Sequence, residues 1–212
     1  MEQTVRSGLV AGAVVAGAAL IGGAIYVLQE RQTEEARFRA LKTDGDFQIR
    51  DYGAMTVAET VVQGARKAAL GKGFEIIANY IFAKSRDGEK IAMTVPVTQD
   101  SGDPMASDPP LFDDDMEGAW RTRFVMPAGR AADDLPKPPD GVELVNLPAR
   151  KMAVVRFSGR ADDKMLTEQE DRLRGWLARD GETAGGEPEY AFYNSPVIPG
   201  PLRRNEVWLA LG

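Results

Sequence analysis

The residue types that carry much of enzyme chemistry are missing from this 212-residue chain, which contains no cysteine and no histidine. Without sulfur or imidazole it cannot form a disulfide, a thiolate zinc site, a cysteine nucleophile or a Ser-His-Asp triad. Carboxylates, lysine, tyrosine and serine remain. One acid–base pair of this kind would be Glu75 with Tyr80 in a dry pocket. Nothing in their spacing requires that pair, so a carboxylate-dependent hydrolase is the least favoured interpretation.

A set of residues in and after one helical segment could instead hold a flat apolar ligand. Aromatic and aliphatic side chains beside the apolar stripe would cover the ligand, and lysine or arginine would pair with its acidic groups. A methionine thioether could reach a bound metal, although methionine more often fills a core. Core packing and solvation of a charged face are the favoured explanation of the same residues. The candidates are Arg66, Lys67, Lys72, Ile76, Tyr80 and Met93.

Charge excludes one class of partner. The chain has 26 basic and 32 acidic residues, a net charge of -6. A general attraction to nucleic acid phosphates is therefore not expected. Arg203-Arg204-Asn205-Glu206 could clamp a carboxylate, but an ion-pair cluster at the start of a strand is the better interpretation.

An uncharged apolar run extends from residue 8 to residue 28. As a helix these 21 residues would span about 31 Å, the thickness of a bilayer's hydrocarbon core. The run is longer than the apolar region of most signal peptides, so an uncleaved anchor is favoured over a cleaved signal or a buried core helix. The sequence thus predicts a single-pass membrane protein, with the side of its soluble domain and its oligomeric state left open.

Between the anchor and residue 45 the charges alternate, which indicates a solvated helical stalk over residues 29–44. Beyond it, apolar residues with a two-residue period indicate strands, and two segments have helical periodicity. The first two strands should pair across the turn at Tyr52-Gly53, and Pro96 indicates an edge or a bulge. The expected strands are 46–51, 54–62, 91–98, 120–126, 144–145, 152–157, 190–197 and 206–211, and the expected helices are about 64–82 and 167–179.

The second half of this region repeats the first. Phe47, Met55 and Val57 correspond to Leu144, Met152 and Val154, each 97 positions later. Each half reads strand, strand, helix, strand, strand, and neither can close on itself. The predicted fold is therefore α+β: a distorted antiparallel eight-stranded β-barrel of two pseudo-symmetric ββαββ halves, with two flanking helices and the N-terminal transmembrane helix. The domains would be 1–28 (anchor), 29–44 (stalk) and 45–212, with halves 45–127 and 141–212.

An ordered set of short blocks resembles the SOUL heme-binding protein family over roughly residues 45 to 211. Each block alone is short, but their order is highly specific. The blocks are Phe47–Tyr52, Gly73-Phe74 through Tyr80-Ile81-Phe82, Lys90–Val97, Phe124–Pro127, Leu135–Pro138, Ala153–Gly159 and Arg203–Trp208.

This resemblance implies binding of heme or a related tetrapyrrole in an apolar surface cleft. Together with the lack of catalytic residue types and the predicted anchor, it predicts noncatalytic sequestration or transfer at a membrane. Some members of the family are thought to ligate the iron through histidine. This chain has neither histidine nor cysteine, so any axial bond must come from another residue or be absent. A receptor for other apolar small molecules on the same duplicated barrel is the main alternative.

Overall fold

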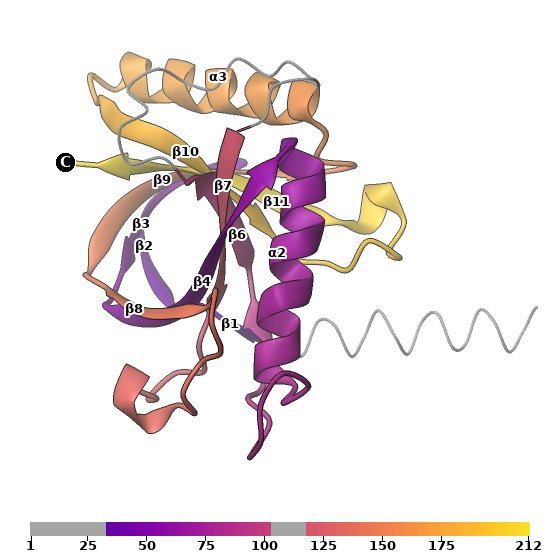
Figure 1. Cartoon of the computed structure of the whole chain (residues 1–212). Coiled ribbons are helices and arrows are strands. Elements are labelled where there is room, and N and C mark those ends of the chain that lie inside the picture. The colour runs from indigo at the N-terminus through magenta and orange to yellow at the C-terminus, as the bar shows by residue number, and fades with distance from the viewer. Residues whose placement is uncertain (1–32, 103–117) are drawn as a thin grey trace, which may run out of the picture. The chain divides into compact units, whose positions relative to one another are not determined.

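The computed structural model describes residues 33–102 and 118–212 (Figure 1). They form a strongly curved antiparallel sheet with two helices packed outside it. The strands are β1 (Glu34–Glu35), β2 (Phe38–Asp44), β3 (Phe47–Tyr52), β4 (Met55–Gly64), β5 (Thr94–Val95), β6 (Val97–Ser101), β7 (Gly118–Val125), β8 (Glu143–Leu147), β9 (Arg150–Ser158), β10 (Ala184–Phe192) and β11 (Arg204–Leu211). The helices are α2 (Arg66–Ile81) and α3 (Asp163–Arg179), with short 3-10 turns η1 (Ala132–Asp134) and η2 (Gly200–Leu202).

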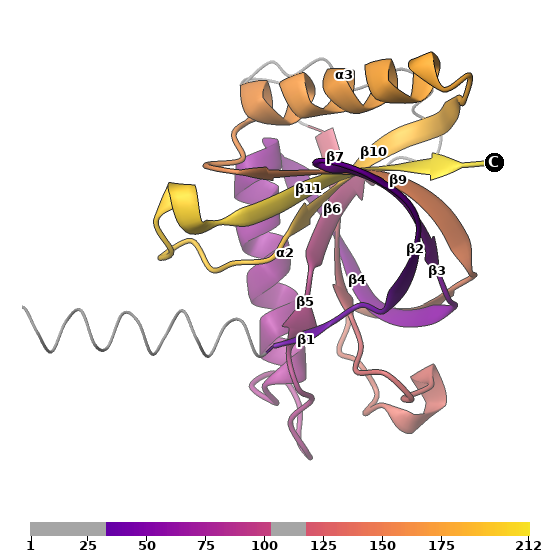
Figure 2. The ribbon, with the colours of Figure 1, turned by 180° about the vertical axis from the view of Figure 1, so that it is seen from behind.

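The large sheet has the strand order β2-β3-β9-β11-β10-β6-β7-β4-β8, and every neighbouring pair is antiparallel. From the central pair β10–β6 outward, equivalent strands of the two halves occupy matched positions: β11 and β7, then β9 and β4, then β3 and β8. This symmetric order agrees with two repeated ββαββ halves. Seven of the eight expected strands lie in this sheet. The expected strand 91–98 is divided at Pro96 between β6, which lies in the sheet, and β5, which forms a separate parallel pair with β1 (Figure 2).

The sheet does not close into the predicted barrel. Among the described residues no backbone ladder joins the two end strands, β2 and β8. A ninth strand, β2, adds to the outer edge of β3 over residues 38–44. The sequence pattern predicted a helical stalk there, and that prediction was wrong. Residues 38–44 form a strand because their main chain pairs with β3. All seven side chains remain exposed, since β2 lies at the edge of the sheet.

The predicted pairing of the first two expected strands across Tyr52-Gly53 is also wrong, because β3 and β4 do not pair with each other. β3 pairs with β2 and β9, while β4 pairs with β7 and β8. The outermost strand of each half therefore lies beside the second strand of the other half. This exchange joins the halves through two ladders at their outer strands in addition to the central β10–β6 ladder.

Helix α2 packs on β4 and β7 through an apolar stripe that includes Ala69, Ile77 and Ile81. Gly73 lies at the point of closest approach, where an added Cβ would be 2.5 Å from Thr122 Oγ1. The two glycines that weaken the helical propensity of this segment thus differ in role, because Gly71 faces open space. Both ends of α2 lie within two residues of the expected boundaries, 64 and 82.

Helix α3 covers β9, β10 and β11 through Leu166, Leu173 and Trp176. It begins at Asp163, four residues before the expected start. The Asp162 side chain accepts a hydrogen bond from Met165 N at 2.9 Å and caps the first turn.

No helix in the described ranges has the length and apolar character needed to cross a bilayer. The expected span over residues 8–28 lies outside those ranges.

Candidate ligand-binding site

A cavity of about 550 Å³ lies where β1 crosses the ends of the large sheet. This volume falls in the range of small-molecule and cofactor sites, about 300–1,000 Å³. Segments distant in sequence form its walls: β1, the turn between β3 and β4, the end of β8 and the segment after β7. We call it the β1 cavity. It is lined by Glu34, Glu35, Ala36, Arg37, Gly53, Ala54, Met55, Thr56, Thr94, Val125, Met126, Pro127, Ala128, Gly129, Arg130, Ala131, Asn146 and Leu147.

Hydrogen bonds hold β1 in place as one wall of this cavity. Ala36 N donates to Val95 O at 3.0 Å, and Ala128 N donates to the Glu34 side chain at 3.1 Å. On the opposite wall, Thr56 Oγ1 donates to Asn146 Oδ1 at 2.9 Å. These contacts join β1 to both the β5 region and the segment after β7, so the cavity depends on three separate parts of the chain.

The lining combines apolar side chains with two arginines and two glutamates, of which Glu35 is paired with Arg204 and Glu34 accepts a hydrogen bond from Ala128 N. Met55 and Met126 contribute thioether side chains, and Arg37 and Arg130 contribute guanidinium groups. Arg130 donates to Glu89 Oε1 at 2.8 Å, whereas Arg37 has no ion-pair partner within the described ranges. Such a surface suits a largely apolar ligand that carries acidic groups, because guanidinium groups form charge-assisted hydrogen bonds with carboxylates.

None of the six sequence-predicted binding residues lines the β1 cavity. Two of them are buried and already bonded. The Arg66 guanidinium, which is 5% exposed, pairs with Asp163 and donates to Gln99 Oε1 at 3.1 Å. Tyr80 is fully buried and donates to Pro136 O at 2.6 Å. Arg66 therefore joins α2 to the start of α3, and Tyr80 joins α2 to the segment after β7.

The other four predicted residues are divided between solvent and core. Lys67 and Lys72 are exposed on α2, and Lys72 Nζ lies 3.1 Å from Glu75 Oε2. Ile76 and Met93 are partly buried and pack against the core beneath α2. The structure thus brings Lys72 and Ile76 to neighbouring positions on one helix, but it does not gather all six residues around one cleft.

The predicted catalytic pair is not formed in a dry pocket. The Glu75 side chain is 60% exposed, while Tyr80 is buried with its hydroxyl bonded to Pro136 O. Burial also raises the pKa of Tyr80, which makes its phenolate less accessible near neutral pH. The Glu75–Tyr80 interpretation is therefore wrong.

A buried polar cluster inside the curve of the sheet surrounds Glu206. Its carboxylate accepts hydrogen bonds from Arg50 at 2.8 and 3.0 Å and from Arg204 at 2.9 and 3.1 Å. Tyr193 and Trp208 each donate at 2.8 Å. Burial alone would raise the pKa of Glu206, but the hydrogen bonds and charges of the two arginines hold it below its ordinary value. The predicted ion-pair cluster at Arg203–Glu206 is confirmed for Arg204 and Glu206, with Arg50 added from β3.

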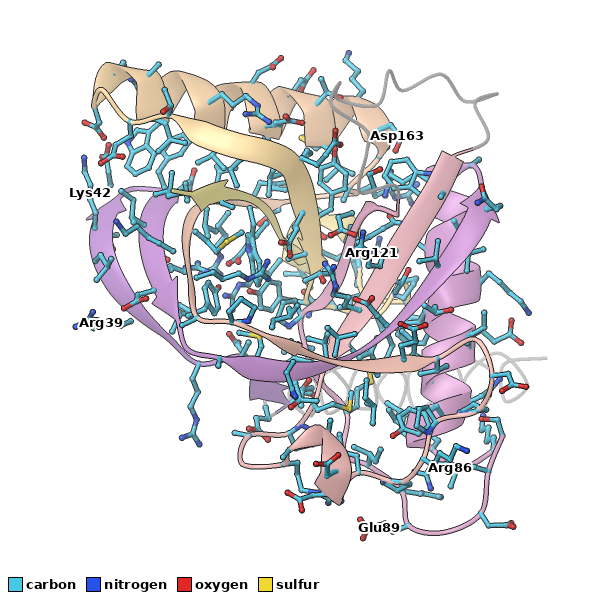
Figure 3. All side chains as sticks on the ribbon, turned by 60° about the vertical axis from the view of Figure 1, so that its left-hand side comes forward. Arg39, Lys42, Arg86, Glu89, Arg121 and Asp163 are labelled. Atoms are coloured by element: carbon cyan, nitrogen blue, oxygen red, sulfur yellow. The ribbon has the colours of Figure 1, made fainter. Side chains whose placement is uncertain are left out.

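A second charged cluster lies on β4, β6, β7 and β10. Arg123 donates to Glu59 at 2.8 Å and to Asp100 at 2.6 Å. Arg121, which is labelled in Figure 3, lies 3.6 Å from Asp100. Burial raises the pKa of Asp100 to about 6 despite the attraction of Arg123, and the nearby Glu189 carboxylate adds to the rise. Arg150 pairs with Glu189, so this cluster contains three arginines and three carboxylates.

In residues 33–102 and 118–212 no group of three or more carboxylates is placed to hold a metal ion.

Sequence reasoning also missed the residues of the β1 cavity. Arg37 fell in the segment interpreted as a stalk, and Met55 was assigned only to a strand. The Phe124–Pro127 block was the one signal near this site, but it did not indicate which segments it would meet.

Fold and cavity together define a duplicated α+β domain with a cavity of about 550 Å³ beside β1. Residues 33–210 match the sequence model of the SOUL heme-binding protein family, so the chain belongs to that family. It is 29% identical over 171 residues to human Heme-binding protein 2, covering 78% of each chain. Membership suggests binding of heme or a related tetrapyrrole.

Two solved structures share the fold at low identity. A hydrolase from Listeria innocua has a TM-score of 0.57 at 10% identity, covering 81% of this chain and 94% of its own. The EcmrR C-terminal domain has a TM-score of 0.55 at 12% identity, covering 82% of this chain and 98% of its own. At such identities the likeness shows the fold alone.

Proposed function

We propose that this protein binds heme or a related tetrapyrrole noncovalently in the β1 cavity, without catalysis, for sequestration or transfer. The observation that carries the proposal is the cavity itself: about 550 Å³, apolar inside, with Arg37 and Arg130 in its wall. Burial of a porphyrin's apolar area would supply most of the affinity, and the guanidinium groups would pair with the propionates. None of the side chains that line the β1 cavity is an obvious catalytic group.

The residues present fit heme without histidine. The Met55 thioether lines the cavity and is of a ligand type found on heme iron, whereas Met93 packs against the core beneath α2. Iron, when bound, would supply the redox and spectroscopic properties. The protein's part is to exclude water and to hold the carboxylates.

An absorbance titration with hemin and with metal-free protoporphyrin tests this proposal. We expect saturable one-to-one changes with both. Arg37→Glu should weaken hemin binding by about 10- to 100-fold, since a hydrogen bond to a charged group contributes about 1.5–3 kcal/mol. Met55→Leu keeps the volume and removes the sulfur, so it should change the hemin spectrum and leave protoporphyrin binding nearly unchanged.

Lys72→Glu is the matched control, because it makes the same charge change on the exposed surface of α2. Loss of hemin binding in Lys72→Glu, with normal binding in Arg37→Glu, would move the site to the surface predicted from the sequence. Absence of a saturable change with either porphyrin would overturn tetrapyrrole binding. The cavity would then favour the receptor for other apolar molecules, and a thermal-shift screen would reveal its ligand.

The membrane location is a separate proposal that rests on the apolar run of residues 8–28. Its length and lack of charge support an anchor that would keep the binding domain at a bilayer surface.

A further inference from the structure

The connection between β10 and β11 exposes two apolar side chains that no function described so far uses. We call residues 193–203 the β10–β11 loop. Val197 is 72% exposed and Leu202 is 57% exposed, the highest values among the large apolar side chains of the described ranges. Isolated exposed apolar residues are ordinary, but two on one loop at such exposure call for a physical explanation.

A buried side chain and several hydrogen bonds hold the loop in this form. Ile198 is buried and anchors it, and Arg203 Nε donates to Ile198 O at 2.7 Å. Gly159 N donates to Gly200 O at 3.0 Å, and Leu202 N donates to Pro199 O at 2.9 Å. The apolar side chains are therefore presented at little further cost in conformational entropy.

Positive charge flanks the two apolar tips. Arg160 is exposed and passes close to the loop, since a Cβ on Gly200 would lie 3.5 Å from Arg160 Cγ. Arg203 bonds only to the carbonyl groups of Ile198 and Pro196. Neither arginine has a carboxylate partner in the part of the chain that the structure describes. Apolar side chains beside unpaired arginines match the boundary between acyl chains and anionic headgroups.

The end of this loop also lies next to the point where the described chain begins. Arg204, the first residue of β11, pairs with Glu35 of β1 at 2.9 Å. From Leu28, the end of the predicted span, to Glu34 the chain has six peptide units, which reach at most about 21 Å. With residues 8–28 in a bilayer, β1 and the root of the loop therefore stay close to its surface.

We propose that the β10–β11 loop is a lipid-contact element that inserts Val197 and Leu202 into the boundary region of an anionic bilayer, with Arg160 and Arg203 at the headgroups. A lipid surface fits better than a protein partner. Stable protein interfaces use about 20–30 residues a side, whereas this patch is two side chains on an eleven-residue loop.

Because the chain contains no cysteine, single-cysteine variants give a clean test. Val197→Cys and Leu202→Cys in the full chain would each carry an environment-sensitive fluorophore. The control is Leu41→Cys, which is 46% exposed on the far edge strand β2. The proteins are mixed or reconstituted with phosphatidylcholine vesicles, with and without phosphatidylserine.

We expect a blue shift and quenching by brominated lipid for the labels at positions 197 and 202, and neither effect at position 41. The shift should increase with phosphatidylserine, and Arg160→Glu should lower the docked population about 30-fold, since it changes two unit charges and each surface charge contributes about 1 kcal/mol. A far-ultraviolet spectrum and a melting curve confirm that this variant is folded. Unshifted labels at 197 and 202, or equal shifts at all three positions, would overturn the proposal.

Discussion

Replacing Glu206 by glutamine tests whether the buried polar cluster holds the two halves of the sheet together. The Glu206 side chain is fully buried, the Arg50 side chain is 3% exposed and the Arg204 side chain is 21% exposed. Glutamine keeps the size but removes the negative charge. Its amide group would also direct a donor toward guanidinium groups that are themselves donors.

The expected loss of unfolding free energy follows from the arginine charges that stay buried after the substitution. Breaking a buried ion pair by removing one partner costs about 3–5 kcal/mol, because the other charge stays buried without compensation. For a domain of this size each kcal/mol lowers the melting temperature by about 2–4 °C, so Glu206→Gln should lose about 6–20 °C. The exposed pair Lys72–Glu75 provides the contrast, and Lys72→Gln should cost less than about 1 kcal/mol.

Urea unfolding followed by tryptophan fluorescence measures both variants. The pH dependence adds a second check. Because the folded pKa of Glu206 is lowered, its contribution is complete above the unfolded-state pKa of about 4.3 and is lost as the pH falls through the folded value. The difference between wild type and Glu206→Gln should therefore shrink in acid. A loss of less than about 1 kcal/mol at pH 7 would refute the reasoning, since it would mean that the arginines are solvated without their partner.

Three further predictions address other parts of the molecule. The folded pKa of Asp100, about 6, lies above its unfolded value. The stability of the wild type relative to Asp100→Asn should therefore fall by about 2–3 kcal/mol as the pH rises from about 4 to 7, which urea unfolding would measure. If the stability difference between the two proteins did not change with pH, the burial argument would be contradicted. Gly71→Ala should raise the stability of the protein by about 0.5–1 kcal/mol, whereas Gly73→Ala should lower it by about 1–3 kcal/mol through the clash with Thr122; melting curves in which both behave alike would refute this assignment. The full chain should stay with membranes through an alkaline carbonate wash and a variant lacking residues 1–28 should not; release of both would remove the predicted anchor.

Local patterns predicted most of the elements. The two-residue period at Phe47 and Ile49 and the helical period at Ala69 and Ile77 correspond to β3 and α2. The end of β10 was misplaced, because the strand stops at Phe192 and the loop that follows carries three prolines. The strand β2 was missed entirely, since an exposed edge strand has no apolar face to show in its sequence.

The candidate site could not be predicted to the same degree. Tyr80 and Arg66 looked available on a helix, and only the fold shows that Pro136 and Asp163 occupy their polar atoms. The β1 cavity joins β1, the turn at Gly53 and the end of β8, and more than a hundred residues of sequence separate β1 from β8. Such a meeting depends on strand pairing between the halves, which no local period encodes.

The sequence by itself excluded the chemistry that needs cysteine or histidine. It also determined the duplicated order of strands and helices and the family blocks, because these depend on residue types and short-range periodicity. Tertiary structure decided which strands pair, that the sheet stays open, and where the β1 cavity forms. It also decided that Arg50, on the first strand of one half, neutralises Glu206, on the last strand of the other. The physical reason is that burial and charge compensation are properties of residues brought together across the chain. A side chain's neighbours in sequence do not set its solvation.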